Sequence, residues 1–192
     1  MSRVFFITHP EVAIDPAVPV PDWPLSERGK ARMTAFAAGP AVAGITAVWS
    51  SAEQKARDGA AILGRALGLT PQVEPALHEN DRSATGFLPP AEFWPLVERF
   101  FATPEVSVEG WERAADAQAR VLGAIARICQ AEKTAGDIAL VAHGGVGALA
   151  LAALSGAAIS RNYDQPGEGG GNYFVFARQD KALLQGWQNI DG

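Results

Sequence analysis

The sequence predicts an α/β fold, a three-layer sandwich in which a mainly parallel central sheet carries helices on both faces. Short apolar runs rich in β-forming residues alternate with longer segments of helical pattern, as in βαβ units. The runs show no polar alternation, which is typical of strands buried on both faces. The 192 residues contain no internal repeat and no linker, so we expect one domain over residues 1–192.

The first elements follow from apolar runs and the residues that interrupt them. Residues 3–7 (RVFFI) predict a strand, and residues 12–24, with four prolines, predict a loop. Ser26 can cap a helix that ends at Gly39-Pro40. Residues 45–49 (ITAVW) predict a second strand. Ser50-Ser51 then caps a helix over 52–67 that Gly68 ends.

The second half repeats the alternation of strands and helices. Residues 138–142 (IALVA) and 172–176 (NYFVF) predict two further strands, and 182–188 an edge strand. A short strand over 71–76 and a loop over 78–90 come before them. Helices are expected over 91–102, 109–133 and from Gly144 to about Leu154, and the face of the long helix includes Trp111, Val121 and Ile125.

Composition excludes several classes of protein. The chain has 16 Lys and Arg against 21 Asp and Glu, a net charge of −5 without a basic block, which argues against a nucleic-acid partner. No apolar run reaches the ~20 residues that span a bilayer, and the start resembles a strand more than a signal peptide. The single Cys129 excludes an internal disulfide framework and suits a reducing compartment. We therefore expect a cytoplasmic protein.

Two of the three histidines directly follow predicted strands, at Thr8-His9 and at Ala142-His143. Open α/β sheets bind ligands at the carboxyl ends of their strands, so a pair in this position points to a functional site. Gly144-Gly145 opens a helix and leaves the backbone accessible, which favours an anion at the helix N-terminus. Ser50-Ser51 at another strand end can contribute hydroxyl and N–H donors.

These residues resemble the histidine phosphatase superfamily, which has the phosphoglycerate-mutase-like fold. The resemblance covers about residues 3–155. It runs through five segments: Thr8-His9-Pro10-Glu11, Asp22-Trp23-Pro24-Leu25-Ser26-Glu27-Arg28-Gly29, Ser50-Ser51-Ala52-Glu53-Gln54-Lys55-Ala56, Leu77-His78-Glu79 and Val141-Ala142-His143-Gly144. In that family the first strand ends in Arg-His-Gly, and its histidine is transiently phosphorylated.

The sequence departs from the family pattern where phosphate is held. Thr8 and Pro10 flank His9 in place of arginine and glycine, and Lys55 stands where the helix presents a second arginine. Lysine offers a point charge instead of a planar bidentate guanidinium, so the exchange is not conservative. Arg57 falls on the opposite helical face, which leaves Arg82 in the Glu79 loop as the candidate to restore positive charge.

The resemblance implies a division of roles among the site residues. His9 is the nucleophile and Glu79 the proton donor. His143, Thr8, Lys55, Arg82 and the backbone of Gly144 are expected to hold the phosphoryl oxygens. No metal or cofactor is implied. The expected partner is a small phosphorylated or anionic ligand, not a nucleic acid or a membrane, and a homodimer is compatible with the sequence.

Other enzyme classes lack their motifs, since the sequence has no G-x-S-x-G elbow, no G-x-G-x-x-G after the first strand and no Walker A motif. Two functions remain open. The first is a metal-independent phosphohydrolase with an altered phosphate pocket, preferred over a mutase because large insertions are missing. The second is a degenerate or repurposed family member that binds an anionic ligand without turnover.

Overall fold

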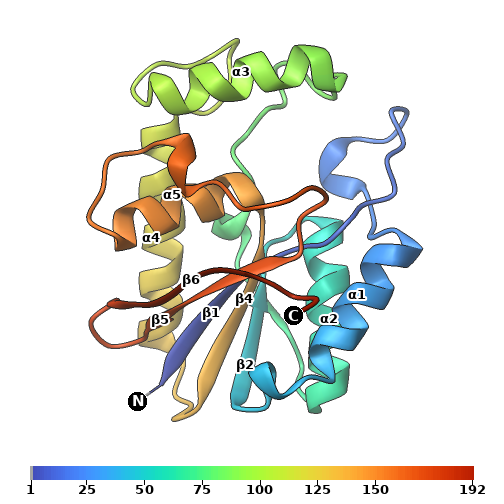
Figure 1. The fold of residues 1–192 in the computed structure, drawn as a ribbon, viewed down its shortest axis with the longest axis vertical. Coiled ribbons are helices and arrows are strands. Elements are labelled where there is room, and N and C mark those ends of the chain that lie inside the picture. Colours follow the sequence, from blue (N-terminus) through green and yellow to red (C-terminus); the bar gives the residue numbers. More distant parts are fainter. Residues whose placement is uncertain (1) are drawn as a thin grey trace.

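The computed structural model describes residues 2–192, which form a six-stranded sheet between two helical layers (Figure 1). The strands are β1 (Arg3–Thr8), β2 (Ile45–Ser50), β3 (Gln72–Val73), β4 (Asp137–Ala142), β5 (Asn172–Ala177) and β6 (Leu183–Asn189). Their order is β3-β2-β4-β1-β5-β6. The first four are parallel, whereas β5 and β6 are antiparallel additions. The predicted fold class, including the edge strand, is confirmed.

The part of the chain that the structure describes has five α-helices. They are α1 (Glu27–Ala37), α2 (Gln54–Leu67), α3 (Pro90–Ala102), α4 (Ala114–Ala131) and α5 (Gly144–Leu154). Four of them cover the faces of the sheet, and α3 lies beyond its carboxyl edge (Figure 1). Alternate residues of β1 enter two separate cores. Phe5 and Ile7 pack with α1 and α2, whereas Val4 and Phe6 pack with α4 and α5. This two-sided burial explains why the strands are apolar throughout.

Local signals set several element ends as expected. The Ser26 hydroxyl accepts a hydrogen bond from Gly29 N at the start of α1, and Gly68 ends α2 with a φ of 68°. The proline-rich loop contains only a short 3-10 turn (Val20–Asp22), and another (Pro75–Leu77) follows β3.

Two helix starts differ from the prediction. The long helix α4 begins at Ala114, not near residue 109, because Glu109 and Gly110 have φ values of 50° and 83° that a helix cannot include. Trp111 is therefore buried in the turn before the helix, not on its face, and its indole N–H donates to Thr85 Oγ1 at 2.8 Å. Helix α2 begins after Glu53, so Ser50-Ser51 is not its cap.

The register of the parallel strands brings three strand ends to one edge of the sheet. Thr8 lies opposite Ala142 and Ser50 opposite Val141, so His9 and His143 follow adjacent strands. Backbone hydrogen bonds extend this register, since His9 N donates to Ala142 O at 3.0 Å and Ser51 N to Val141 O at 3.1 Å. None of the helices within residues 2–192 is both long and apolar enough to cross a membrane.

Candidate active site

The two histidines meet at the carboxyl edge of β1 and β4. Their ring centroids are 5.2 Å apart, and the planes cross at 69° in an edge-to-face arrangement. His143 is fully buried, whereas His9 is half-buried. The strand-end pairing predicted from the sequence therefore places one partly accessible imidazole against one enclosed imidazole.

The surroundings of His9 fix both its tautomer and its charge. Its Nδ1 lies 2.9 Å from the carbonyl oxygen of Pro10, which can only accept, so Nδ1 carries the proton. The lone pair is consequently on Nε2. Burial, together with the neighbouring His143 and Lys55, lowers the pKa of His9 from 6.5 to about 3. His9 is thus a neutral imidazole at neutral pH with its Nε2 lone pair available.

His143 is held from one side by groups of the β2–α2 turn. Its Nε2 shares a hydrogen bond of 2.7 Å with Ser51 Oγ and lies 3.5 Å from Glu53 Oε1. Its Nδ1 is buried and has no partner among residues 2–192. Burial lowers the pKa of His143, against the opposing influence of Glu53 and Glu79. His143 is therefore oriented by Ser51 and kept neutral.

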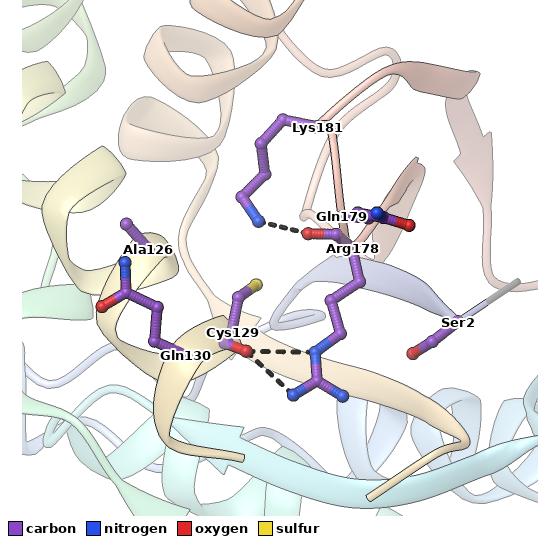
Figure 2. A pocket seen from close by; sticks show the side chains of 7 residues that line it. All are labelled: Ser2, Ala126, Cys129, Gln130, Arg178, Gln179 and Lys181. Atoms are coloured by element: carbon purple, nitrogen blue, oxygen red, sulfur yellow. Dashed lines mark hydrogen bonds between the residues drawn. The ribbon is translucent and has the colours of Figure 1, made fainter. Parts of the chain in front are cut away.

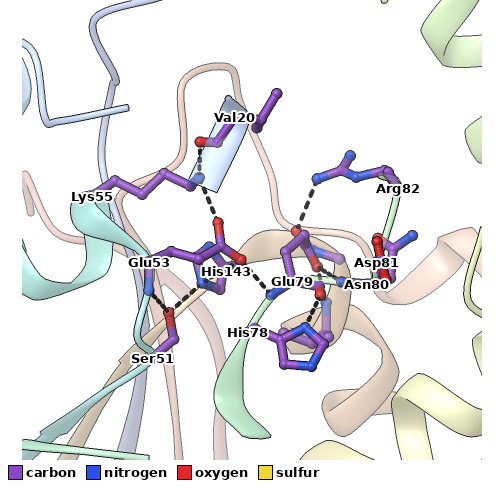
Figure 3. A network of polar contacts seen from close by, with 12 residues as sticks. Val20, Ser51, Glu53, Lys55, His78, Glu79, Asn80, Asp81, Arg82 and His143 are labelled. Atoms are coloured by element: carbon purple, nitrogen blue, oxygen red, sulfur yellow. Dashed lines mark hydrogen bonds and ion pairs between the residues drawn. The ribbon is translucent and has the colours of Figure 1, made fainter. Parts of the chain in front are cut away.

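Lys55 is buried, as its predicted place in the pocket requires, but its positive charge already faces the carboxylate of Glu53. Its Nζ lies 2.6 Å from Glu53 Oε2 and donates to Val20 O at 2.7 Å, so the proline-rich loop reaches over the site (Figure 3). Burial alone would raise the pKa of Glu53, but His143 and Lys55 outweigh it and lower that pKa to about 2. Sequence reasoning assigned Glu53 no role. Its position directly after Ser50-Ser51 and two residues before Lys55 was the available signal.

Glu79 lies at the N-terminus of α5, where it accepts hydrogen bonds from Gly145 N and Val146 N, both at 2.9 Å (Figure 3). The Glu79 carboxylate therefore accepts hydrogen bonds from N–H groups at this helix start, where the sequence predicts an anionic ligand. Burial opposes its ionisation, but Arg82, His143 and the Gly145 N–H together lower its pKa. Glu79 is an ionised, fixed carboxylate beside His143.

Arg82 lies beside Glu79 without forming a tight ion pair with it. Its guanidinium lies 3.9 Å from Glu79 Oε2 and stacks over the rings of Phe93 and Trp111, at 5.1 Å and 5.7 Å from their centroids. Aromatic faces attract a guanidinium and hold it in one orientation. With the histidines neutral, the two cations Lys55 and Arg82 balance the two carboxylates Glu53 and Glu79.

Thr8 is completely buried, and its hydroxyl has partners inside the chain. It donates to Gln165 Oε1 at 2.7 Å and accepts from Asn172 N at 2.9 Å. The Gln165 amide in turn fills the space beside Gly144, where its Nε2 lies 2.2 Å from the position that a Cβ would take. Gln165 and Asn172 were missed because the irregular loop before β5 carries no local signal of the site.

The structure thus brings all seven candidate residues to one edge of the sheet, and their chemical roles remain predictions. A cavity of about 550 Å³ lies at the opposite, amino edge, lined by residues that include Ser2, Cys129 and Arg178 (Figure 2). Among residues 2–192, no group of three or more His, Cys, Asp or Glu side chains is arranged to hold a metal ion.

Comparison with known proteins identifies the family. The family model of the histidine phosphatase superfamily (branch 1) matches residues 7–188, so the chain belongs to this superfamily. No curated protein matched.

Solved structures of the same fold are distant in sequence. A mycobacterial glucosyl-3-phosphoglycerate phosphatase in complex with inorganic phosphate is 22% identical, with a TM-score of 0.78 and 100% of each chain covered. YhfR from Bacillus stearothermophilus is 18% identical, with a TM-score of 0.77 and coverage of 96% of this chain and 95% of the other. A putative alpha-ribazole-5'-P phosphatase from Escherichia coli is 17% identical, with a TM-score of 0.72, covering 100% and 97%.

Proposed function

We propose that this member of the histidine phosphatase superfamily is a metal-independent phosphohydrolase that cleaves a small phosphomonoester through a phosphohistidine at His9. The observation that carries the proposal is the state of His9. Its Nδ1 proton is held by Pro10 O, and its pKa is lowered to about 3, so a neutral Nε2 lone pair is available for attack. Membership in the superfamily supports the same reading.

The reaction has two displacements at phosphorus. In the first, His9 Nε2 forms a bond to phosphorus, the ester P–O bond breaks, and the leaving oxygen takes a proton from Glu79. In the second, Glu79 takes a proton from water, the oxygen of that water bonds to phosphorus, and the P–N bond breaks to release phosphate. Arg82 and Lys55 are the cations nearest to the developing charge, and His143 is the neutral group beside it.

The geometry of Glu79 makes the first step sensitive to pH. Two backbone N–H groups and Arg82 favour its carboxylate form, so the acid that donates the proton is the minor form at neutral pH. A proton donor with a lowered pKa works best under acidic conditions. We therefore expect turnover to increase as the pH falls below neutral.

The fold relatives support a substrate class for the proposal. Two of the similar structures are described as a glucosyl-3-phosphoglycerate phosphatase and as a putative alpha-ribazole-5'-P phosphatase. We extend only this shared chemistry, a phosphomonoester of a small metabolite, to the present chain. The lone Cys129 suits the cytoplasmic location that we propose for it.

A second function, anion binding without turnover, is favoured by the charge balance of the site. Glu53 already neutralises Lys55, and the Glu79 carboxylate occupies two donors at the start of α5. A phosphate dianion entering this site finds less net positive charge than two free arginines would provide. The same contacts that support the site therefore weaken its hold on phosphate.

The decisive assay is a broad panel of phosphomonoesters with the purified chain, with and without a chelator, comparing wild type with His9→Ala and Lys55→Ala. We expect weak turnover that the chelator does not abolish. His9→Ala removes nearly all of it because no other covalent route exists, whereas Lys55→Ala leaves a measurable remainder. Wild-type activity that does not exceed that of His9→Ala on any substrate would reject the phosphatase and favour the binding function instead.

A further inference from the structure

A buried polar cluster lies directly behind His9 and consists of Thr8, Gln165 and Asn172. Thr8 Oγ1 donates to Gln165 Oε1, and Asn172 Nδ2 donates to the same oxygen at 3.2 Å. Thr8 and Asn172 are 0% and 1% exposed, whereas Gln165 is half-buried, so the cluster is enclosed on the side of the two strands. The cluster joins the end of β1, the start of β5 and the loop between α5 and β5.

The hydrogen bonds determine which way the Gln165 amide faces. Asn172 Nδ2 also donates to Pro166 O at 3.1 Å, and a carbonyl oxygen can only accept, so this atom is the nitrogen of Asn172. It follows that the atom of Gln165 facing Asn172 is the oxygen. The Gln165 NH₂ group must then point away from the cluster. It has no acceptor among the described residues and is not enclosed.

The free NH₂ group lies between the two histidine-bearing strand ends. On one side, Gln165 is bonded to Thr8, the residue before His9. On the other, its Nε2 lies 2.2 Å from the position of a Cβ on Gly144, the residue after His143. Only glycine at position 144 leaves room for this amide. The amide is therefore held between these two positions by a hydrogen bond on one side and by close packing on the other.

We propose that Gln165 is a ligand-binding residue whose NH₂ group donates to an oxygen of the phosphoryl group at His9, with Thr8 and Asn172 as its positioning residues. This inference rests on the proposed phosphate site. It replaces the predicted contact between Thr8 and phosphate with a relay, in which Thr8 orients Gln165 and Gln165 contacts the ligand. A neutral amide supplies a donor without adding charge, in keeping with the balanced charges around it.

The test measures phosphate binding directly and separately from turnover. The full chain is labelled with ¹⁵N at glutamine side chains, and the Gln165 signal is identified by its absence in Gln165→Leu. Titration with inorganic phosphate is expected to shift this signal. Gln165→Leu is expected to weaken phosphate binding about 10- to 100-fold, because it removes one hydrogen bond to a charged group. Gln188→Leu on the exposed edge of β6 is the matched control and leaves binding unchanged.

The relay through Thr8 has its own test. Thr8→Val removes the hydroxyl at nearly constant shape and should weaken phosphate binding and raise KM as Gln165→Leu does. Thr8→Ser keeps the hydroxyl and should restore both, which a purely packing role of the Thr8 methyl group would not predict. Thr8→Val with unchanged phosphate affinity would overturn the relay.

The outcomes separate this inference from the proposed function. Phosphate binding with an unshifted Gln165 signal, or with a Gln165→Leu affinity equal to wild type, overturns the inference and leaves the phosphatase proposal intact. A shifted signal and weakened binding in a chain without turnover support the inference and reject the phosphatase. A wild-type chain that does not bind phosphate rejects both.

Discussion

The two edges of the sheet each hold one cation, a half-buried arginine at one edge and a buried lysine at the other, and the partners of the two differ. At the amino edge, Arg178 donates to the carbonyl oxygens of Cys129, Glu132 and Thr134 at the end of α4, next to the 550 Å³ cavity (Figure 2). At the carboxyl edge, Lys55 pairs with the side chain of Glu53. Backbone carbonyls are fixed in place, whereas a carboxylate side chain can exchange partners. The 550 Å³ cavity thus lies beside a cation held by backbone carbonyls, whereas the candidate site residues lie at the edge where a side chain holds the cation.

The largest effect expected at the carboxyl edge follows the loss of its acid. Glu79→Gln keeps the size of the side chain but cannot donate a proton to the leaving oxygen, so we expect kcat to fall by about 10²- to 10⁴-fold. It should also remove the increase in activity toward acidic pH. Steady-state kinetics across pH on a phosphomonoester test this, with the exposed Glu27→Gln as control. A variant that retains the wild-type pH profile would contradict the role of Glu79.

At the amino edge, the expected effect is on stability alone. Arg178→Met removes hydrogen bonds to three carbonyl groups and should lower the free energy of unfolding by about 2–3 kcal/mol. Because the site lies at the other edge, kcat/KM should not change. Urea denaturation and kinetics test this together, with the exposed Arg57→Met as control. A loss of turnover in folded Arg178→Met would break the distinction between the edges.

An intermediate effect is expected when Lys55, the cation of the carboxyl edge, loses its carboxylate partner. Glu53→Gln removes the negative charge that faces Lys55, so the site gains one net positive charge and inorganic phosphate should bind about tenfold more tightly. Isothermal titration calorimetry measures this effect, and Lys55→Met in the same background should cancel it. Unchanged or weaker binding in folded Glu53→Gln would show that the ion pair does not limit phosphate affinity.

The last effect concerns the dependence of stability on pH. The pKa of His9 is about 3 in the folded chain and 6.5 in the unfolded chain. The contribution of His9 to the free energy of unfolding is therefore complete above pH 6.5 and is lost as the pH falls toward 3. The pKa of Glu53 is about 2 in the folded chain and 4.5 in the unfolded chain, so Glu53 adds a further loss of stability as the pH falls below 4.5. Between pH 6.5 and 4.5, His9→Asn should reduce the slope of the free energy of unfolding against pH by up to about 1.4 kcal/mol per pH unit. Urea unfolding across this range measures it, and equal slopes would contradict the buried neutral state of His9.

The sequence predicts those parts of the fold that depend on short-range patterns. Apolar runs locate the central strands, and the strand-end histidines locate the edge that carries the site. The start of α4 could not be predicted, because the left-handed conformation of Glu109 leaves no trace in a helical pattern. Nor could Gln165, which is 157 residues from Thr8 and meets it only through the order of the strands. Contacts that depend on tertiary packing, such as that between Thr8 and Gln165, can be identified only in the structure.

The position of β1 has a consequence for synthesis of the chain. Of the six strands it is made first, yet it lies between β4 and β5, whose residues 137–142 and 172–177 are made more than 100 residues later. One edge of this apolar strand therefore stays unpaired on the ribosome until β4 has emerged, and the other until β5 has emerged. Contacts of such long sequence separation also fold slowly. Chains truncated before β4 consequently expose β1 and are expected to aggregate or to occupy chaperones, and His9 cannot meet His143 before β4 has emerged.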